Sequence, residues 1–475
     1  MTSPRRTKIV ATLGPASNDL DILKRMITAG LDIVRLNFSH GTAGDHENRV
    51  NLVREAAKAC GKEIGVLADL QGPKIRIAKF RKDKISLQEN DIFILDANLA
   101  SDEGDTLQVG IDYKALPQDV KSGDILLLDD GRLVFEVQRV ENQRIICLVK
   151  IGGILSNNKG INRQGGGLSA KALTDKDKAD LKTAVRLGTD YIAISFPRSA
   201  DDIHEARKLI QEAGSDCGIV AKIERAEAVT AIDEIINASD AVMVARGDLG
   251  VEIGDAELPA VQKHIINRAR ALDKAVITAT QMMESMIHNA IPTRAEVFDV
   301  ANAVLDGTDA VMLSAETATG DHPDVVISAM ARICQTAEKQ KLTQVSRHRV
   351  ECQFEHVDEA IAMATMYAAN HFKIRTIIAL TESGSTPLWM SRIRSGIPIY
   401  GLTSSIKTER KMTLYRGVYP VGFTVDKHKD INQQAIQVLL NKNIVNVGDY
   451  VIITRGDMIG QHGGTNNMKI IRVEE

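Results

Sequence analysis

The feature that most constrains the fold is a repeated alternation of two kinds of segment. Short runs rich in β-branched residues are each followed by an amphipathic stretch, and several of these stretches end in glycine, the pattern of strands alternating with helices. Eight runs qualify, at residues 7–13, 32–38, 65–70, 191–196, 218–224, 241–247, 275–280 and 310–316. Parallel strands need helical crossovers, and a closed ring leaves no exposed edge. The sequence therefore predicts an α/β protein built on a (β/α)8 TIM barrel, with a doubly wound open sheet as the alternative.

The helical stretches carry end signals. Residues 19–29, 174–187 and 294–306 precede Gly30, Gly188 and Gly307, which suit left-handed caps at helix C-termini. Thr174 and Asp177 have the spacing of a capping pair at a helix N-terminus.

One interval breaks the alternation between the third and fourth runs. Residues 72–170 lack helical periodicity and hold alternating segments at 84–87, 91–95, 125–128, 133–137 and 144–149, separated by turn-forming tripeptides such as Ser122-Gly123-Asp124. We predict an inserted small β-barrel domain on the third βα loop. Because loops at that face of a barrel carry function, we expect the insert to act as a lid over a site rather than as a passive insertion.

A second α/β unit follows the barrel. Strand-like runs at 376–380, 397–402 and 450–454 come after the eight barrel strands are used, and the polar stretch 345–355 suits a boundary. We therefore divide the chain into 1–71 (barrel, first part), 72–170 (inserted lid), 171–344 (barrel, second part) and 345–475 (C-terminal α/β regulatory domain).

Charge and cysteine usage limit the partners. Among 475 residues, 59 Lys and Arg face 62 Asp and Glu, so the near-neutral chain lacks the positive charge typical of nucleic-acid binding, and a metabolite is the expected partner. No apolar run approaches the ~18 residues needed to cross a bilayer. The five cysteines are scattered, without a Cys-x-x-Cys pair, which favours neither disulfides nor zinc. We expect a cytoplasmic protein.

Reacting groups of such barrels lie at the C-terminal ends of the strands. The predicted strand ends carry Arg35, Asn37, Ser39, His40, Asp69, Lys222, Glu224, Arg246, Gly247, Asp248, Thr278, Thr280, Ser314 and Glu316. Since side chains alternate along a strand, Lys222 and Glu224 point to the same side, and we expect them at the barrel mouth.

These residue types suit a metal and an anion. Glu224 and Asp248 supply hard carboxylate oxygens suited to Mg²⁺ or Mn²⁺, unless Glu224 is only the ion-pair partner of Lys222. Arg35 and Lys222 add cations that favour a substrate with several negative charges, such as a phosphorylated carboxylic acid. Because the sequence contains no Gly-x-x-x-x-Gly-Lys-[Ser/Thr] loop, any nucleotide must be held in another way.

Six separated segments resemble a known family. They are 7–15 (TKIVATLGP), 35–41 (RLNFSHG), 69–76 (DLQGPKIR), 222–224 (KIE), 245–252 (ARGDLGVE) and 280–286 (TQMMESM). In this order they resemble the pyruvate kinases of bacterial type. The resemblance implies transfer of the phosphoryl group of phosphoenolpyruvate to ADP, giving pyruvate and ATP, by a Mg²⁺-dependent enzyme that usually assembles as a homotetramer.

The resemblance also implies roles for single residues. Glu224 and Asp248 match the Mg²⁺ ligands, Lys222 the cation that stabilises the transferring phosphoryl group, and Arg35 a contact to the substrate phosphate. The amides of Gly247 and Asp248, with Thr280, match a cradle for the substrate carboxylate. The nucleotide-facing positions are Asn37, Ser39, His40, Arg76 and Lys159. Ser314 and Glu316 match family positions to which we assign only a supporting role near the proton relay.

One position departs from many members of the family. The residues that match a K⁺ site are Asn37, Ser39, Asp69 and Leu70, and such members have an acidic residue where this chain has Lys74. An ammonium there makes a further cation less favourable, so we expect turnover that needs Mg²⁺ but little or no K⁺. The alternative is that Lys74 faces solvent and the K⁺ site is retained.

The C-terminal unit holds a turn rich in hydroxyl groups, formed by Thr381, Glu382, Ser383, Gly384, Ser385 and Thr386. This loop resembles an effector site, and we expect activation by a phosphorylated metabolite, either a sugar phosphate or AMP, although such turns also cap helices.

Two competing functions remain open from sequence. A related barrel enzyme would use the same site for C–C cleavage without ADP, and a metabolite sensor would bind without turnover.

Overall fold

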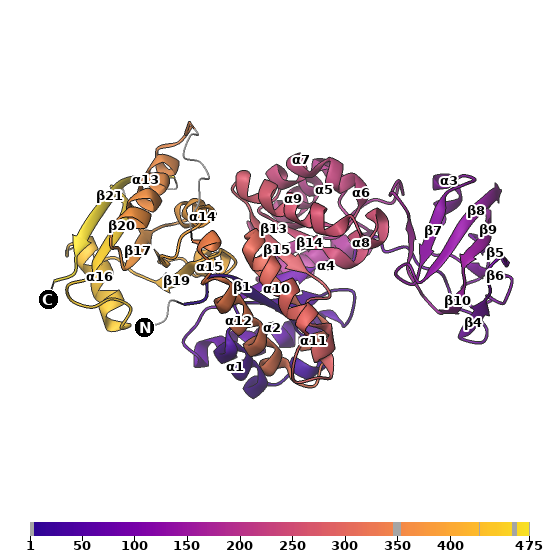
Figure 1. The fold of residues 1–475 in the computed structure, drawn as a ribbon, viewed down its shortest axis with the longest axis horizontal. Helices are drawn as coiled ribbons and strands as arrows, with labels where there is room; N and C mark the ends of the chain where they lie inside the picture. Colours follow the sequence, from indigo (N-terminus) through magenta and orange to yellow (C-terminus); the bar gives the residue numbers. More distant parts are fainter. Residues whose placement is uncertain (1–3, 345–352, 427, 458–462, 475) are drawn as a thin grey trace.

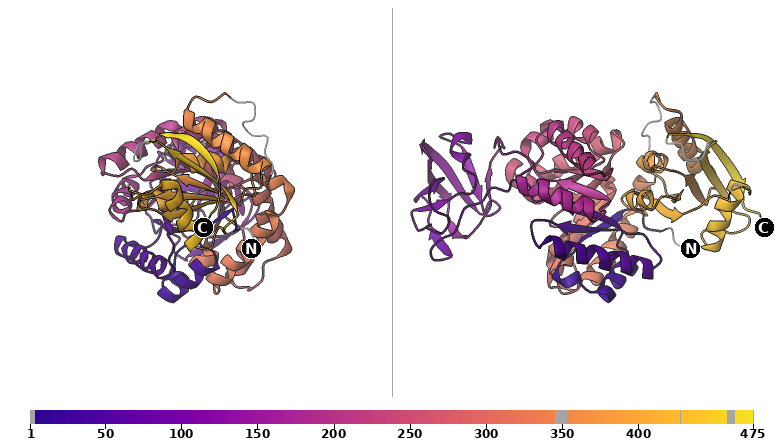
Figure 2. Two further views of the ribbon diagram at one scale, coloured as in Figure 1. Left: turned by 90° about the vertical axis from the view of Figure 1, so that its left-hand side faces the viewer. Right: turned by 180° about the vertical axis from the view of Figure 1, so that it is seen from behind.

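The computed structural model describes residues 4–344, 353–426, 428–457 and 463–474. Three bodies lie in a row, with the barrel in the centre, the inserted domain at one end and the C-terminal domain at the other (Figure 1). Seen from behind, the same order holds (Figure 2). Part of the polar boundary stretch, 345–352, lies outside the described residues, and the limits proposed above for the domains stay predictions.

The barrel is closed, which confirms the predicted architecture over the open sheet. Its strands follow the order β1-β2-β3-β12-β13-β14-β15-β16, and β16 pairs with β1 in parallel, Lys8 opposite Ala310. The strands are β1 (Lys8–Thr12), β2 (Ile33–Asn37), β3 (Gly65–Asp69), β12 (Tyr191–Ile194), β13 (Gly218–Ile223), β14 (Ala241–Ala245), β15 (Ala275–Ala279) and β16 (Ala310–Leu313).

The strands end one to three residues earlier than predicted, because the chain turns into loops or helices at the rim. The difference is three residues at the eighth strand and two residues at the fourth and sixth strands. Arg246 and Gly247 belong to the first turn of a helix, and Ser314 is the N-cap of another, so these residues are not strand residues.

Helices cover the outside of the barrel (Figure 1). They are α1 (Leu20–Ala29), α2 (Ala43–Ala59), α4 (Asp175–Arg186), α5 (Ala200–Glu212), α6 (Ala226–Thr230), α7 (Ile232–Ala238), α8 (Arg246–Ile253), α9 (Leu258–Ala271), α10 (Arg294–Asp306), α11 (Ala315–Ala318) and α12 (Pro323–Ala337), with short 3₁₀ turns η1 (Pro15–Ser17), η2 (Glu284–Ile287) and η3 (Lys341–Thr343). Their apolar faces pack on the strands in one buried cluster.

The predicted caps are confirmed at the ends of three helices. Thr174 and Asp177 form a reciprocal capping box at the start of α4. Gly30 and Gly307 end α1 and α10 with φ of 123° and 104°, values that glycine tolerates best. Gly188 has φ of 64° just after the cap of α4.

The insert is rich in strands, as predicted. Its elements are β4 (Lys84–Leu87), β5 (Ile92–Asp96), β6 (Gln108–Gly110), α3 (Leu116–Asp119), β7 (Ile125–Leu128), β8 (Leu133–Glu141), β9 (Arg144–Ile151), β10 (Gly153–Ser156) and β11 (Ile161–Arg163). Six strands form one sheet in the order β11-β7-β8-β9-β5-β6, and β4 pairs with β10. The alternation did not reveal β6, β10, β11 or α3, which are only three or four residues long.

The inserted sheet closes differently from a continuous barrel. No strand ladder joins its edge strands in the part of the chain that the structure describes. Instead, isolated bridges tie Arg76 to Gly160, next to β11, and Ile77 to Ile111, next to β6. The segment at 76–77, which leads from the barrel into the insert, therefore spans the open side of the sheet. The expected small β-barrel is thus a six-stranded sheet closed by single bridges.

The C-terminal domain is a five-stranded α/β sheet in the order β19-β18-β17-β20-β21. Its elements are α13 (Val357–His371), β17 (Thr376–Leu380), α14 (Ser385–Arg392), β18 (Ile399–Thr403), α15 (Ile406–Met412), β19 (Val418–Gly422), α16 (Ile431–Asn441), β20 (Tyr450–Gly456) and β21 (Thr465–Arg472). The predicted strands are confirmed, and β19 and the antiparallel β21 are additional.

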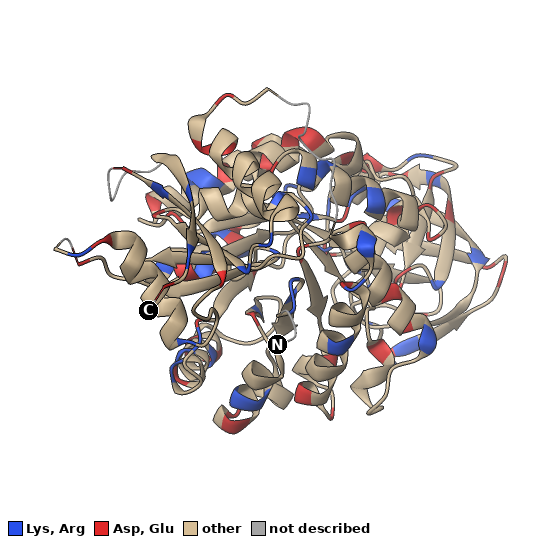
Figure 3. Cartoon of the chain, turned by 60° about the vertical axis from the view of Figure 1, so that its left-hand side comes forward, with Lys and Arg blue, Asp and Glu red and all other residues tan. Residues whose placement is uncertain are grey.

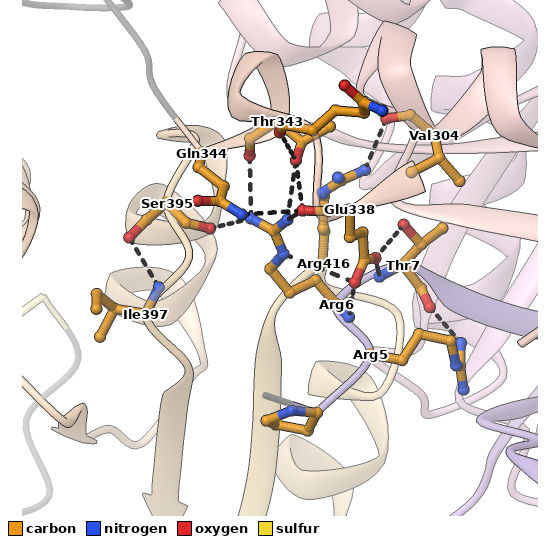
Figure 4. Close-up of polar contacts among 12 residues, drawn as sticks. Arg5, Arg6, Thr7, Val304, Glu338, Thr343, Gln344, Ser395, Ile397 and Arg416 are labelled. Atoms are coloured by element: carbon orange, nitrogen blue, oxygen red, sulfur yellow. Dashed lines mark hydrogen bonds and ion pairs between the residues drawn. The ribbon is translucent and has the colours of Figure 1, made fainter. Parts of the chain in front are cut away.

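A buried polar junction joins this domain to the barrel (Figure 4). Arg6 donates to the carbonyls of Glu338 (2.7 Å) and Thr343 (3.0 Å) on the barrel side and to that of Ser395 in the C-terminal domain. The Glu338 carboxylate accepts hydrogen bonds from the amide of Arg6 (2.9 Å) and from Thr7 (2.6 Å). The Arg6 guanidinium thus links both domains through buried hydrogen bonds.

A second buried contact strengthens the junction. Arg392, at the end of α14, pairs with Asp309, which directly precedes β16, and both side chains are 1% exposed. Charged residues of both signs are otherwise dispersed over the three domains (Figure 3).

Two expectations about the whole chain can be compared with the described residues. Cys60, Cys147, Cys217 and Cys334 are free thiols, whereas Cys352 lies outside the described residues. None of the helices in the described ranges has the length and apolar character needed to cross a bilayer.

Candidate active site

A network of ion pairs fills the C-terminal rim of the barrel. Arg35, at the end of β2, donates to Asp69 at the end of β3 over 2.6 Å. Lys222, near the end of β13, lies 3.2 Å from Asp69 and 2.9 Å from Glu224. Asp69 and Glu224 are 1% and 2% exposed. The structure thus brings together residues from three distant stretches, as strand alternation predicted.

The Lys222 ammonium has three hydrogen-bond partners in the described structure. Besides the two carboxylates, it donates to Ser195 Oγ over 2.7 Å, and Ser195 donates in turn to the Leu70 carbonyl over 2.7 Å. Ser195 was not predicted from the sequence, although it directly follows β12 and the first and fourth strand ends were the two left without a candidate. A neutral hydroxyl positions the ammonium without cancelling its charge.

The pKa values of the buried acids differ because their neighbours differ. Burial raises the pKa of Glu224, and the nearby negative charges of Asp248 and Asp69 raise it further, against the opposing effect of Lys222. Burial acts in the same direction on Asp69, but Lys222 and Arg35 outweigh it and hold the pKa of Asp69 below its usual value. Burial would lower the pKa of Lys222, yet Asp69 and Glu224 raise it, so the lysine stays charged.

Asp248, in the first turn of α8, has an unexpected partner. Lys74, on the segment that leads into the insert, places its ammonium 3.0 Å from Asp248 Oδ1, and its side chain is 27% exposed. Lys74 therefore faces the site and is not directed only to solvent. Three carboxylates, of Asp69, Glu224 and Asp248, here meet three cations, of Arg35, Lys74 and Lys222.

The two carboxylates expected to hold a divalent cation fit that role. Their mutual repulsion contributes to the raised pKa of Glu224, so a cation between them would relieve an unfavourable interaction. Carboxylate oxygens are also the donors that Mg²⁺ prefers. Among the described residues no group of three or more His, Cys, Asp or Glu suits a metal, so substrate and water oxygens would have to supply the other ligands.

The expected carboxylate cradle lies beside this pair. Thr280 Oγ1 accepts from the Gly247 amide (2.8 Å) and donates to the Ala279 carbonyl (2.6 Å), so two members of the cradle are hydrogen-bonded to each other. Thr280 and Gln281 have φ of 68° and 53°. A left-handed conformation is an outlier for a β-branched residue and costs roughly 1–3 kcal/mol per position, a strain that is typical of functional sites.

Three further strand-end residues do not face the mouth. Arg246 directs its guanidinium to Asp299 on α10 (2.6 and 2.8 Å), because its place in the first turn of a helix rotates its side chain away from the barrel axis. Thr278 is buried against Thr308. The Glu316 carboxylate accepts from the Ser314 amide (2.6 Å) at the start of α11, a local cap.

The nucleotide-facing set is only partly brought together. Ser39, His40 and Arg76 line one cavity of about 610 Å³ between the rim and the insert, with the insert's Lys79, Lys114 and Asn158. Lys159 instead pairs with Asp129 (2.7 Å) within the insert. Asn37 accepts from the Ser39 amide (3.2 Å).

The K⁺ set lies at the neighbouring ends of β2 and β3, where Asn37 is in register with Asp69. The charged member, Asp69, already pairs with Arg35 and Lys222, and the Leu70 carbonyl accepts from Ser195. The negative charge that would attract a monovalent cation is therefore met by protein cations.

The hydroxyl-rich turn of the C-terminal domain opens a separate cavity of about 260 Å³, lined by Thr381, Glu382, Ser383, Ser385 and Thr386 together with Thr403, Ser404, Arg455 and Thr465. Gly384 is the N-cap of α14, so the free amides of that helix start at this cavity. Arg455 is a cation that the sequence analysis did not select, because its strand lies seventy residues further on.

A closed barrel with buried carboxylates and ammonium groups at one rim defines an enzyme for a small anionic substrate. Comparison with known proteins gives the family. The family model for the pyruvate kinase barrel domain matches residues 4–327, and that for the pyruvate kinase alpha/beta domain matches residues 359–471. The chain belongs to the pyruvate kinase family, and its function is phosphoryl transfer from phosphoenolpyruvate to ADP in glycolysis, giving pyruvate and ATP.

Individual relatives agree along nearly the whole chain. Pyruvate kinase II of Salmonella typhimurium is 56% identical over 477 residues, covering 99% of both proteins. Pyruvate kinase of Haemophilus influenzae is 55% identical over 95% of this chain and 96% of the relative. Pyruvate kinase of Geobacillus stearothermophilus is 40% identical over 98% of this chain and 80% of the relative. The family generally uses a divalent metal ion and often K⁺.

Glu252, on the helix that carries Asp248, has a buried carboxylate and a backbone contact to the insert. Glu252, in the last turns of α8, is 4% exposed and accepts from the Ala226 amide (3.0 Å), while its carbonyl accepts from the Gly165 amide of the insert (2.9 Å). Burial, with a smaller contribution from the charge of Glu227, raises the pKa of Glu252 to about 7.

This shift predicts a pH-dependent stability. Because the folded pKa of Glu252 is raised from 4.5 to about 7, the folded state binds more protons between these values, and the free energy of unfolding falls as pH rises through this range. Glu252→Gln should remove that loss, making the variant more stable relative to wild type at pH 8 than at pH 5, by up to about 3 kcal/mol.

Urea unfolding at both pH values measures this difference. The exposed Glu212→Gln serves as the control and should follow the wild-type pH dependence. Parallel curves for wild type and Glu252→Gln would show that Glu252 titrates normally.

Proposed function

We propose that the rim residues carry out phosphoryl transfer in the roles that the family resemblance implies. Lys222 and Arg35 bind the phosphoryl group of phosphoenolpyruvate, and Glu224 and Asp248 hold Mg²⁺ or Mn²⁺. The amides of Gly247 and Asp248 bind the substrate carboxylate with Thr280. The observation that carries the proposal is the convergence of Lys222, Glu224 and Asp69 within 2.9 to 3.2 Å at the barrel mouth.

Lys222 is suited to a phosphoryl group in transfer. A loose transition state spreads negative charge over the phosphoryl oxygens, and an ammonium held in place beforehand stabilises that charge without reorganising. Ser195 and Asp69 both contact the Lys222 ammonium, so it would stay in place if Glu224 held a divalent cation. A bound divalent cation would neutralise negative charge on the substrate oxygens. Thr280, or water, gives the enolate its proton.

The cavity between rim and insert suits the nucleotide. Ser39, His40 and Arg76 contribute from the proposed set, and the insert adds Lys79 and Lys114 as further cations for a diphosphate. Asn37 and Lys159 complete the set when ADP is bound. With the insert as a lid, water is excluded from the transferring group.

The finer properties of the enzyme follow the same proposal. The cofactor is Mg²⁺ or Mn²⁺, and K⁺ is dispensable. The protein acts in the cytoplasm, which the free thiols and the glycolytic family support. Assembly as a homotetramer is supported by apolar side chains on the outer face of the barrel, where Ile291 and Phe298 are 77% and 69% exposed.

The C-terminal cavity is proposed as an effector site for a sugar phosphate or AMP. A phosphate there would meet the N-terminus of α14, the hydroxyls of Thr381, Ser383, Ser385 and Thr386, the turn at Gly384, and the guanidinium of Arg455. The buried pair of Arg392 and Asp309 connects the far end of α14 to the barrel.

Replacing Lys222 tests the central role. Lys222→Met keeps the length of the side chain but removes its charge, so we expect ATP synthesis from phosphoenolpyruvate and ADP to fall by at least roughly a thousandfold. Mn²⁺ binding, measured by electron paramagnetic resonance, should persist because Glu224 and Asp248 are intact.

The exposed Lys208→Met is the matched control and should retain wild-type turnover. Near-normal turnover of Lys222→Met would contradict the assignment. The same coupled assay tests the two competing functions, because a cleavage enzyme would form pyruvate without ADP and a sensor would form no ATP.

The requirement for K⁺ is tested in salts that lack it. Because Lys74 places a cation beside Asp248, turnover in tetramethylammonium or sodium chloride with Mg²⁺ should stay within about twofold of that in KCl. Lys74→Glu removes this cation and adds an anion, so that variant should gain a dependence on K⁺. A collapse of the wild-type rate without K⁺ would overturn the argument from Lys74.

Activation is tested by titrating the enzyme at low phosphoenolpyruvate with AMP and with several sugar phosphates. We expect one class to lower the KM for phosphoenolpyruvate, and Arg455→Leu to weaken that activation by at least roughly tenfold in effector concentration, since it removes a charged hydrogen-bond donor. Unchanged activity with every compound would remove the effector proposal.

A further inference from the structure

The guanidinium of Arg246 contacts three successive carbonyls of the loop that follows β15. Nε donates to Ala279 (3.2 Å) and Thr280 (3.1 Å), and Nη2 donates to Thr280 (2.6 Å) and Gln281 (3.3 Å). The two terminal nitrogens also form a bidentate pair with the Asp299 carboxylate of α10. The Arg246 side chain is 9% exposed, so these contacts form largely out of solvent.

The loop that Arg246 contacts has a strained backbone. Thr280 and Gln281 both have positive φ, which neither side chain favours, so the surrounding structure has to impose this backbone. The Thr280 carbonyl accepts hydrogen bonds from Arg246, and the Thr280 hydroxyl accepts one from the Gly247 amide. Arg246 and the adjacent Gly247 thus both hold the conformation of Thr280.

We propose that Arg246, anchored by Asp299, is a positioning residue that holds Thr280 in its catalytic conformation. The inference rests on the role of Thr280 in the proposed function. Arg246 acts through the backbone, since its guanidinium points away from the barrel mouth. Asp299 holds the Arg246 guanidinium in place through its carboxylate. The planar shape of that guanidinium lets it reach three carbonyls at once.

A second contact ties the same loop to α10. The Glu296 carboxylate accepts from the amide (2.7 Å) and hydroxyl (2.5 Å) of Ser285, in the 3₁₀ turn η2 that follows Thr280. Two residues of α10 therefore hold the loop. Glu296 contacts it directly at Ser285, and Asp299 acts through Arg246, which reaches the strained peptide.

Asp299→Asn tests the proposal without removing Arg246. Loss of the charged anchor should lower kcat by roughly ten- to a hundredfold while the KM for ADP stays within about twofold, because only the Thr280 loop is displaced. Asp299→Glu keeps the carboxylate and should recover most of kcat, and Arg246→Lys, which keeps the charge but not the fork, should not.

The matched control is the pair of Arg268 and Asp233, which is also bidentate, through Nε and Nη2, and joins α9 to α7 on the barrel surface. Asp233→Asn should leave kcat unchanged. If Asp299→Asn does not fold, circular dichroism reveals it, and Asp299→Glu and Arg246→Lys then carry the test.

A double-mutant cycle separates positioning from a general loss of stability. If Asp299 acts through Thr280, adding Asp299→Asn to Thr280→Ala should lower kcat by less than about twofold further, whereas its effect on the unfolding midpoint should be the same in both backgrounds. Equal losses of kcat in both backgrounds, or full activity of Asp299→Asn, would overturn the inference. Full activity of Thr280→Ala alone would instead overturn the proposed role of Thr280.

Discussion

The parallel closure of the barrel is the constraint on which the rest of the structure depends. Every neighbouring pair of its strands runs in the same direction, and the last strand pairs with the first. All eight strand ends therefore meet at one rim, and residues far apart in the sequence come together, as Asp69 and Lys222 do at 3.2 Å. The same closure leaves no sheet edge, so the chain can lengthen only through its loops, and the insert uses the third of these.

The rim brings like charges together, and this sets its chemistry. Three carboxylates would repel one another in a buried site, and three cations offset them, although unevenly. Asp69 contacts two cations and has a lowered pKa, whereas burial, together with the nearby charge of Asp248, raises the pKa of Glu224. A cation beside Glu224 and Asp248 would relieve this imbalance.

Sequence periodicity predicted the barrel, its caps and the charged rim, because these depend on local alternation and on the direction of parallel strands. It failed where a side chain's direction depends on a neighbour far along the chain. Arg246 was expected at the mouth, but the strand ends at Ala245, directly before it, and the helix turns its side chain toward Asp299. Ser195 is a small neutral residue, so no charge marked it. The partner of Lys74 lies 174 residues away, beyond any local pattern.

The insert is joined to the barrel by two chain segments that meet at one buried carboxylate. Asp177, 0% exposed, accepts from the Gly72 amide on the way out (3.0 Å) and from the Thr174 amide on the way back (2.9 Å). Gly72 has φ of 68° and lies so close to Ser195 that a Cβ would approach its side chain to 2.7 Å. A larger residue at Gly72 would displace Ser195 and with it Lys222. The base of the insert is therefore in contact with Ser195, the residue that positions the Lys222 ammonium.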